Sequence, residues 1–321
     1  MYNLNEYDTI IIAFSGGKDS TATLLHVYEQ LTKEIGGPDP LANKVELWHH
    51  LIDGAPGSEA FMDWPITEQF CKELADDWNI PLYFSWREGG FKQEMLRNNT
   101  MTAPVHWENP DGSIGSAGGN GPLITRRMFP QVGSINSGRW CSAKLKIDVM
   151  SAAINNQERF KGHKTLVVTG ERAEESKSRA NYNKFEKHRS NTKTRTVDHW
   201  RPIHDWTEKQ VWDILEKHKV RVHPAYYLGW SRLSCMTCIF GNADQWASAK
   251  LLFPEQFEQI AQYEEEFKHT IKRKKSVREL AKEGKAYAGN AGLFKSHLYE
   301  DTFIDTWGIP SGAYGKSDGP T

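Results

Sequence analysis

A short glycine-rich segment near the N-terminus has the residue types of a phosphate-binding loop. Ser15-Gly16-Gly17-Lys18-Asp19-Ser20 follows directly after an apolar run at 9–14 and precedes a helical pattern. Glycines let backbone N–H groups approach phosphate oxygens, a helix N-terminus favours negative charge, and a lysine adds a mobile cation. The segment is not a Walker A loop, because Ile12 stands where the first glycine would be and Asp19 follows the lysine. It predicts a phosphate cradle, and a glycine-rich turn without a ligand is the alternative.

A second polar segment follows another apolar run. Thr169-Gly170-Glu171-Arg172-Ala173-Glu174-Glu175-Ser176 comes after 165–169, and Arg179 lies shortly beyond it. Guanidinium groups bind anionic oxygens through paired hydrogen bonds, and Gly170 would let the chain come close to a ligand. The segment therefore predicts a second loop that faces a polyphosphate.

Asp53 follows the apolar run at 45–52. An acidic residue at the tip of a strand can accept hydrogen bonds from an adenine amino group or a ribose hydroxyl. Asp53 is therefore a candidate nucleotide ligand, and a turn or helix-capping role is the alternative.

Three of the four cysteines have a spacing that suits a metal centre. Cys235 and Cys238 form a CxxC, Cys141 lies upstream, and His223 precedes the pair. Such a set can hold a [4Fe–4S] cluster, or zinc with His223 as the fourth ligand, and a metal-free reduced pair is the third reading. Cys71 lies on an apolar helix face and is predicted to be an inert core thiol.

The elements that must position these residues alternate between strands and helices. The apolar patterns predict strands at 9–14, 45–52, 80–86 and 165–169, and helices at 24–35, 66–78, 140–154, from 207 onward and at 254–273. A capping box at Thr207 and Gln210 marks one helix start. This order predicts an α/β fold, a doubly wound and mostly parallel sheet that binds ligands beyond the carboxyl ends of its strands. Residues 109–121 and 181–196 lack a period and are expected to be loops, the first of them a long loop or an insertion.

The composition is that of an ordinary cytoplasmic protein. The 321 residues are 38% hydrophobic and 25% charged, with a formal net charge of −1. This balance gives no general attraction to nucleic acid, although basic runs at 184–195 and 268–275 could contact phosphates; a solvated face is the commoner explanation. Four cysteines do not make a disulfide framework, no run is long enough to span a membrane, and residues 1–6 do not form a signal peptide.

Taken in order, the motifs resemble those of a known family. The glycine-rich segment resembles the PP-loop of N-type ATP pyrophosphatases, which cut ATP between the α- and β-phosphates. With Arg139-Trp140-Cys141-Ser142, Leu145-Lys146, residues 169–176 and the segment 200–206, it resembles the phosphoadenosine phosphosulfate (PAPS) reductase family. Within that family the similarity is closest to the ATP pyrophosphatase component of DNA phosphorothioation systems. The resemblance implies an adenine nucleotide alpha hydrolase-like domain over 1–241; a helical extension at 242–305 and a poorly ordered tail at 306–321 are expected to follow.

The resemblance also implies an activity, namely ATP-dependent adenylylation of an acceptor with release of pyrophosphate, in support of sulfur transfer. Catalysis would fall to Lys18, Asp19, Arg172 and Arg179, with Asp19 helping to bind Mg²⁺. ATP would be bound by residues 15–20 and by Asp53, Gly170, Glu171 and Ser176. The family has Asp-Thr-Gly where this chain has Asp53-Gly54, so only Asp53 is carried over. Assimilatory members carry an adjacent cysteine pair; Ser142 follows Cys141 here, so three cysteines match, namely Cys141, Cys235 and Cys238.

Two other functions stay open at this point. The first is reduction of a sulfonucleotide. Sulfonucleotide reductases use a nucleophilic cysteine in a C-terminal tail, and no cysteine follows Cys238 here, so the sequence predicts against this activity. The other is a nucleotide-binding module without catalysis whose zinc is structural. The sequence does not name the acceptor, which could be nucleic acid, protein or a small molecule. It equally leaves open a sulfur donor protein and a homo-oligomer.

Overall fold

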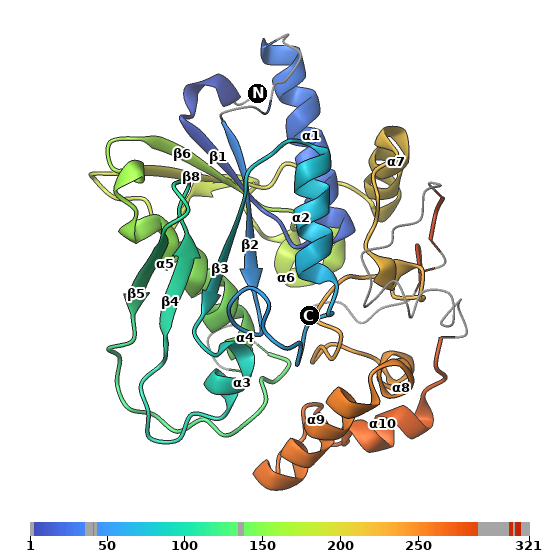
Figure 1. The fold of residues 1–321 in the computed structure, drawn as a ribbon. Coiled ribbons are helices and arrows are strands. Elements are labelled where there is room, and N and C mark those ends of the chain that lie inside the picture. Colours follow the sequence, from blue (N-terminus) through green and yellow to red (C-terminus); the bar gives the residue numbers. More distant parts are fainter. Residues whose placement is uncertain are drawn as a thin grey trace.

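A mixed eight-stranded sheet forms the centre of the computed structural model, which describes residues 3–35, 41, 44–133, 138–287, 308–310 and 312–315. The strand order is β5-β4-β3-β2-β1-β6-β8-β7 (Figure 1). The five central strands, β3, β2, β1, β6 and β8 in spatial order, pair in parallel. Antiparallel pairing adds β4 and then β5 at one edge of the sheet and β7 at the other. The strands are β1 Thr9–Ala13, β2 Val45–Leu51, β3 Leu82–Arg87, β4 Pro104–Glu108, β5 Ile114–Gly118, β6 Lys164–Val168, β7 Phe185–Lys187 and β8 Thr196–Trp200.

Helices cover both faces of this sheet and extend beyond it. The described helices are α1 Lys18–Ile35, α2 Thr67–Asp77, α3 Gly90–Met95, α4 Trp140–Ser142, α5 Asp148–Asn156, α6 Lys177–Ala180, α7 Glu208–His218, α8 Ala243–Leu252, α9 Pro254–Phe267 and α10 Val277–Glu283. A π-helical turn, Ala143–Ile147, joins α4 to α5. The predicted doubly wound, mostly parallel α/β fold is therefore confirmed.

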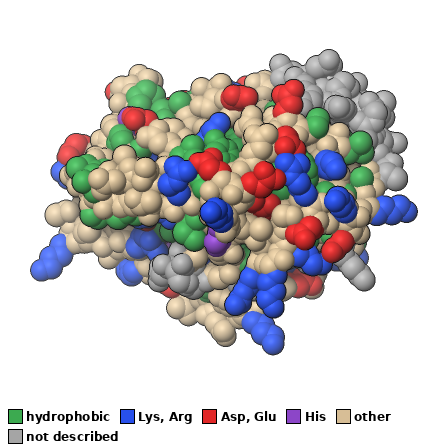
Figure 2. Space-filling view, turned by 90° about the horizontal axis from the view of Figure 1, so that it is seen from below, with side chains coloured by type: hydrophobic (Ala, Val, Ile, Leu, Met, Phe, Trp, Pro, Cys, Tyr) green, Lys and Arg blue, Asp and Glu red, His purple; other side chains and the backbone are tan. Residues whose placement is uncertain are grey.

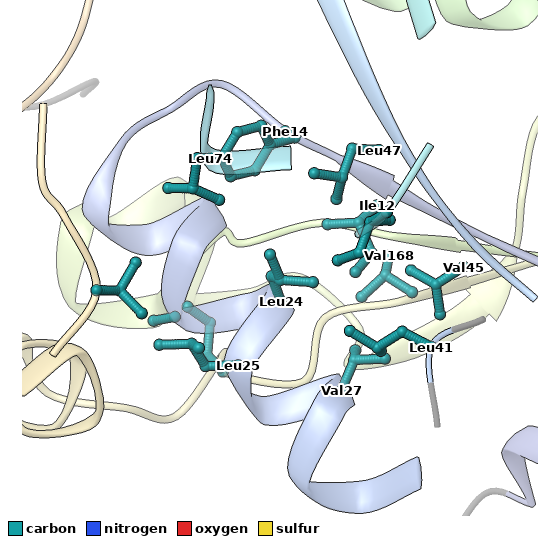
Figure 3. Close-up of a cluster of buried hydrophobic side chains, with 14 of the residues drawn as sticks. Ile12, Phe14, Leu24, Leu25, Val27, Leu41, Val45, Leu47, Leu74 and Val168 are labelled. Carbon is teal, nitrogen blue, oxygen red and sulfur yellow. The ribbon is translucent and has the colours of Figure 1, made fainter. Parts of the chain in front are cut away.

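Strand β1 shows why the sheet needs helices on both faces. Successive side chains of a strand point to opposite faces. Ile10 and Ile12 pack with Leu24 of α1, whereas Ile11 packs with Val149 of α5, and all of them are fully buried. Figure 3 shows the first of these clusters, which fills the space between the sheet and α1. A continuous β-branched run is therefore stable only as an inner strand with apolar helices on both sides.

The C-terminal helices share a core with segments that lie near the middle of the chain. Phe257 and Ile260 of α9 belong to the same buried cluster as Phe61, Phe91 and Trp140. Figure 1 shows α8, α9 and α10 together below the sheet, on the side of α3 and α4. Burial of apolar area thus attaches these helices to the loops that follow β2 and β3. Among the residues described here, no helix combines the length and the apolar composition needed to cross a membrane.

Three local predictions need correction. Residues 109–121 are not one long loop, because Ile114–Gly118 forms β5, which pairs with β4 across a turn stabilised by Asp111. The segment 181–196 contains the short edge strand β7. Helix α9 ends at Phe267, where Lys268 has a left-handed backbone. In each case the structure is set by strand pairing or by a capping turn among polar residues, which show no hydrophobic period from which it could be predicted. The predicted tail at 306–321 lies largely outside the described residues.

Two buried histidines predict a pH dependence of folding stability. Burial lowers the pKa of His49 from 6.5 to about 4, and burial together with His49 lowers that of His223 to about 3. Because their pKa values are lower in the folded state, these histidines bind protons in the unfolded chain at a higher pH than in the folded protein. Their contribution to the free energy of unfolding is therefore complete above pH 6.5 and is lost as the pH falls toward 4. Each histidine contributes a loss of up to about 1.4 kcal/mol per pH unit. We expect the free energy of unfolding in urea to fall steadily between pH 6.5 and 4.5.

The matched control for this experiment uses one buried and one exposed histidine. His49→Gln should reduce the slope of unfolding free energy against pH, because one buried proton acceptor is removed. His163→Gln, at an exposed position, should leave the slope unchanged. Equal slopes in the His49→Gln variant and the unmodified protein would contradict this assignment.

Candidate functional site

The glycine-rich segment is a closed strand-to-helix turn between β1 and α1. Ser20 Oγ donates to the carbonyl of Gly17 at 2.9 Å and accepts the N–H of Ser15 at 3.2 Å. Gly16 has a φ of +75°, a left-handed conformation that favours glycine. The predicted turn is therefore confirmed as a geometry, and the loop is ordered by its own hydroxyl groups.

A distant segment holds this loop from the other side. The Tyr226 hydroxyl accepts the N–H of Lys18 at 2.9 Å and that of Leu233 at 3.3 Å. The Lys18 ammonium donates to the carbonyl of Ser231 at 2.8 Å, and its side chain is 4% exposed. Sequence reasoning missed Tyr226 and Ser231, because no local pattern connects residues more than 200 positions from the loop. The His-Pro-Ala-Tyr segment at 223–226 before the CxxC was the one available signal.

A network of charges joins the loop to two other segments. Arg172 Nε lies 2.6 Å from Asp19 Oδ1, and Lys18 Nζ lies 3.3 Å from Glu208 Oε1. Burial disfavours the Asp19 carboxylate, but Lys18 and Arg172 outweigh burial and lower its pKa. Burial likewise disfavours the Lys18 ammonium, yet Asp19, Tyr226 and Glu208 raise its pKa. Both groups are therefore held in their charged forms, and the start of α1, the loop after β6 and the start of α7 are electrostatically linked.

The other residues predicted at the loop after β6 have local partners. A Cβ at Gly170 would lie 2.8 Å from the carbonyl oxygen of Asp19, so glycine is needed for the close approach to α1. Ser176 caps α6 by accepting the N–H of Arg179, whose guanidinium pairs with Glu175. Glu171 accepts a hydrogen bond from Thr169 and lies near Arg201. Each predicted residue thus already has a structural contact.

The Asp53 carboxylate forms its hydrogen bonds within its own loop. It accepts backbone N–H groups of Phe61 at 2.8 Å, Met62 at 2.9 Å and Asp63 at 2.9 Å. Burial raises its pKa, and these three bonds oppose the rise. This geometry matches the turn-forming alternative rather than a role in binding adenine or ribose, and no described contact links Asp53 to the charge network around Lys18. An isolated acidic residue in a sequence does not distinguish these two roles.

The structure brings the three predicted metal cysteines into one region. Burial and the neighbouring Cys238 raise the pKa of Cys141 to about 11, and burial raises that of Cys235 well above its ordinary value, with further contributions from Cys238 and Cys141. All three pack against the cluster that contains the C-terminal helices. Within the described part of the chain, no three His, Cys, Asp or Glu side chains are arranged as the ligand shell of one ion.

His223 does not join these cysteines in the structure. Its Nδ1 accepts the N–H of Ala225 at 3.2 Å, and its Nε2 lies 3.3 Å from the Thr67 hydroxyl. Because both ring nitrogens are engaged, the prediction of His223 as a fourth ligand finds no geometric support. Cys71 is fully buried beside Phe70 and Leu74, as its position on an apolar helix face predicts.

Two arginines that sequence reasoning did not assign, Arg139 and Arg232, interact electrostatically with residues of the candidate site. Burial lowers the pKa of Arg139, Cys141 opposes that effect, and the like charges of Arg179 and Arg232 lower it further. The positive charge of Arg232 also lowers the pKa of Asp19. The Arg139 Nε atom is buried, with no hydrogen-bond partner in the described structure. Arg139 thus interacts with Cys141 and with Arg179 and Arg232, and this group of positive charges would stabilise an anion.

Comparisons with known proteins relate the chain to one family. Residues 125–240 match the model of the phosphoadenosine phosphosulfate reductase domain. An uncharacterised 37.8 kDa protein of Escherichia phage 186 is 32% identical over 260 residues, which is 79% of this chain and 74% of that protein. An adenosine 5'-phosphosulfate reductase of Burkholderia cepacia is 34% identical over 71 residues, 22% of this chain and 27% of that enzyme. A PAPS reductase structure from Candida auris is 13% identical with a TM-score of 0.41, covering 73% of this chain and 85% of that chain.

The Tyr226 hydroxyl predicts a loss of stability when it is removed. Tyr226→Phe leaves the N–H groups of Lys18 and Leu233 without their acceptor in a buried setting, which costs about 1–3 kcal/mol. We expect a lower urea midpoint with an unchanged m-value. Tyr83→Phe is the control, because the Tyr83 hydroxyl has no described hydrogen-bond partner. Equal midpoints for the two variants would show that Tyr226 does not hold the loop.

Proposed function

The chain belongs to the PAPS reductase-like family, and on this premise we propose that it is a PP-loop enzyme that uses ATP to adenylylate an acceptor and thereby supports sulfur transfer. The domain match and the α/β fold indicate a nucleotide-binding protein of this family. The observation that carries the specific proposal is the closed loop at the carboxyl end of β1, surrounded by buried or half-buried cations.

The cations around the loop suit a polyphosphate. Lys18 and Arg172 are both buried, and Arg179 is half-buried. In the structure these groups are balanced by acidic side chains, so a bound polyphosphate must compete with those acids for them. Asp19 and Glu208, which lie beside Lys18, are hard oxygen donors of the kind Mg²⁺ prefers, and the ion would offset the charge of the phosphates. The preformed turn and the charged network together favour binding over a passive glycine turn.

The proposed reaction needs no protein nucleophile. An oxygen nucleophile of the acceptor attacks the α-phosphorus of ATP, and the bond from that phosphorus to the bridging oxygen of the β-phosphate breaks. Pyrophosphate leaves with the electron pair, and the acceptor loses its proton to solvent or to a nearby base. Catalysis then depends on positioning and on stabilisation of the departing charge. We assign charge stabilisation to Arg172 and Arg179, with Lys18 and Asp19 positioning the loop.

The cysteine region supports the sulfur-transfer part of the proposal. Cys141, Cys235 and Cys238 border the same apolar cluster, although the described side chains are not arranged as the ligand shell of one ion. Thiolates are the ligands of both iron–sulfur clusters and zinc. When bound, a [4Fe–4S] cluster with three protein ligands would leave one iron able to carry sulfur; zinc in the same place would be structural. The positive charges of Arg139 and Arg126 interact with Cys141, so they favour an anionic centre there.

Reduction of a sulfonucleotide is the competing activity within the family. Residues 239–321 contain no cysteine that could attack a sulfur atom, and the buried thiols have raised pKa values that disfavour the nucleophilic thiolate. These observations support adenylylation over reduction. The similarity to phosphorothioation enzymes and the identity of the acceptor stay predictions.

Substitution of Lys18 should weaken ATP binding. In Lys18→Gln the side chain stays polar but loses the charge, and a charge-assisted hydrogen bond is worth about 1.5–3 kcal/mol. We expect a tenfold or greater loss of affinity for a non-cleavable α,β-methylene analogue of ATP, measured by calorimetry, and slower pyrophosphate release from ATP. Lys161→Gln, an exposed lysine far from the loop in sequence, is the control.

Each outcome of this experiment supports a different conclusion about the loop. Thermal melting of both variants confirms that they are folded. Unchanged analogue binding in folded Lys18→Gln would refute the role of the loop. Binding of ATP by the unmodified protein without any pyrophosphate release, with every acceptor class tried, would favour the non-catalytic module.

The cysteines predict a metal centre that can be measured directly. Protein purified without oxygen should contain iron and sulfide and absorb visible light, and Cys141→Ser should lose much of that iron. Cys71→Ser is the control, because it removes a buried core thiol and should leave the iron content unchanged. A colourless protein that contains zinc would overturn the cluster and support a structural ion.

A further inference from the structure

The turn between α9 and α10 concentrates positive charge on the surface. Its sequence from 268 to 275 carries five lysines and arginines, and we call it the basic turn. Four of the five side chains are exposed, namely Lys268, Arg273, Lys274 and Lys275. The proposed reaction does not use this turn, so its charge needs another explanation.

The charge of the basic turn is only partly neutralised. Lys275 pairs with Glu283 at 2.6 Å. No acidic side chain within the described residues pairs with Lys268, Arg273 or Lys274. In the other basic run of the chain, Lys184 and Lys187 have acidic partners and Arg195 donates to backbone carbonyls. Arg189 and Lys193 of that run are exposed, and no acidic side chain among the described residues pairs with them. The basic turn thus places three exposed cations without a described acidic partner within seven residues, from Lys268 to Lys274.

The basic turn is attached to the segment that leads to the cysteines. Gln131 Nε2 donates to the carbonyl of Thr270 at 3.0 Å, and Arg127 pairs with Glu266 at the end of α9. The neighbouring Arg126 lies over the Trp140 ring, 4.6 Å from its centroid, and interacts electrostatically with Cys141. Arg127 and Arg126, which pair with Glu266 and Glu94, therefore connect the basic turn to the cysteine site.

Exposed apolar side chains lie along the same line. Met128 is 36% exposed and Val132 is 45% exposed, and each lies next to a residue that contacts α9 or the basic turn. Figure 2 views the molecule from below and shows a face where Lys and Arg side chains occur among apolar ones. Cations beside exposed apolar groups match the two parts of an unpaired nucleic-acid strand, its phosphates and its bases.

We propose that the basic turn and the adjoining segment 126–132 bind a single-stranded polynucleotide and lead it to the cysteine site. This inference rests on the proposed function, since it names the class of acceptor that the enzyme would modify. The phosphates lie on Lys268, Arg273 and Lys274, and unpaired bases contact Met128 and Val132. A base-paired duplex would offer the phosphates but would hide the base faces from these side chains.

The test is fluorescence anisotropy with labelled single-stranded RNA and DNA of about 16 nucleotides and with the matching duplex. The test variant combines Lys268→Gln, Arg273→Gln and Lys274→Gln. The control variant combines Lys33→Gln, Lys161→Gln and Lys217→Gln, three exposed lysines outside the basic turn and segment 126–132. We expect the test variant to bind the strand at least tenfold more weakly and the control to bind normally. The slope of log affinity against log salt should fall in magnitude by about 2 in the test variant.

Several results would overturn this inference. They are no strand binding by the unmodified protein, equal loss in both variants, or duplex binding as tight as strand binding. Polyglutamate that competes as well as the strand would point instead to an acidic protein surface. ATP-analogue binding, measured in the same samples, should be equal in both variants. Loss of the proposed ATP activity would therefore be seen separately from loss of strand binding.

Discussion

The ion pair between the half-buried Asp19 and the buried Arg172 is the interaction on which the candidate site depends. Its two residues belong to the start of α1 and to the loop after β6, elements that the parallel sheet places side by side at the carboxyl ends of β1 and β6. Charges removed from water must be paired, and breaking such a pair leaves an unfavourable buried charge. Lys18 extends the pair to Glu208 at the start of α7. The loops at this edge are therefore held as one unit, and a ligand that alters one of them acts on all three.

The cysteine region depends on a different force. Cys141, Cys235 and Cys238 border an apolar cluster to which α9 and α10 contribute Phe257, Ile260 and Leu280. The C-terminal helices thus help to form the wall of the cysteine site. Burial there also raises the pKa values of the Cys141 and Cys235 thiols, and a bound metal ion would stabilise their thiolate forms.

Sequence patterns predicted the elements well and the contacts poorly. The continuous apolar run of β1 and the capping box of Thr207 with Gln210 both appear as expected, because each depends on residues that are neighbours in the chain. The hairpin of β4 and β5 was missed, since Gly-rich strands at a sheet edge have no strong hydrophobic period. Asp53 illustrates the limit for side chains, because its carboxylate binds backbone groups of its own loop.

The amino-acid sequence alone determined the fold class, the strand-to-helix turn at 15–20 and the family to which the motifs belong. These features come from short patterns whose physical causes, namely apolar burial, glycine conformations and helix capping, are local. Only the tertiary structure decided that Tyr226 holds the turn, that Asp19 pairs with Arg172, and that His223 does not reach the cysteines. Those contacts join positions far apart in the chain, and the folded sheet and its loops determine which of the available charged and polar groups meet.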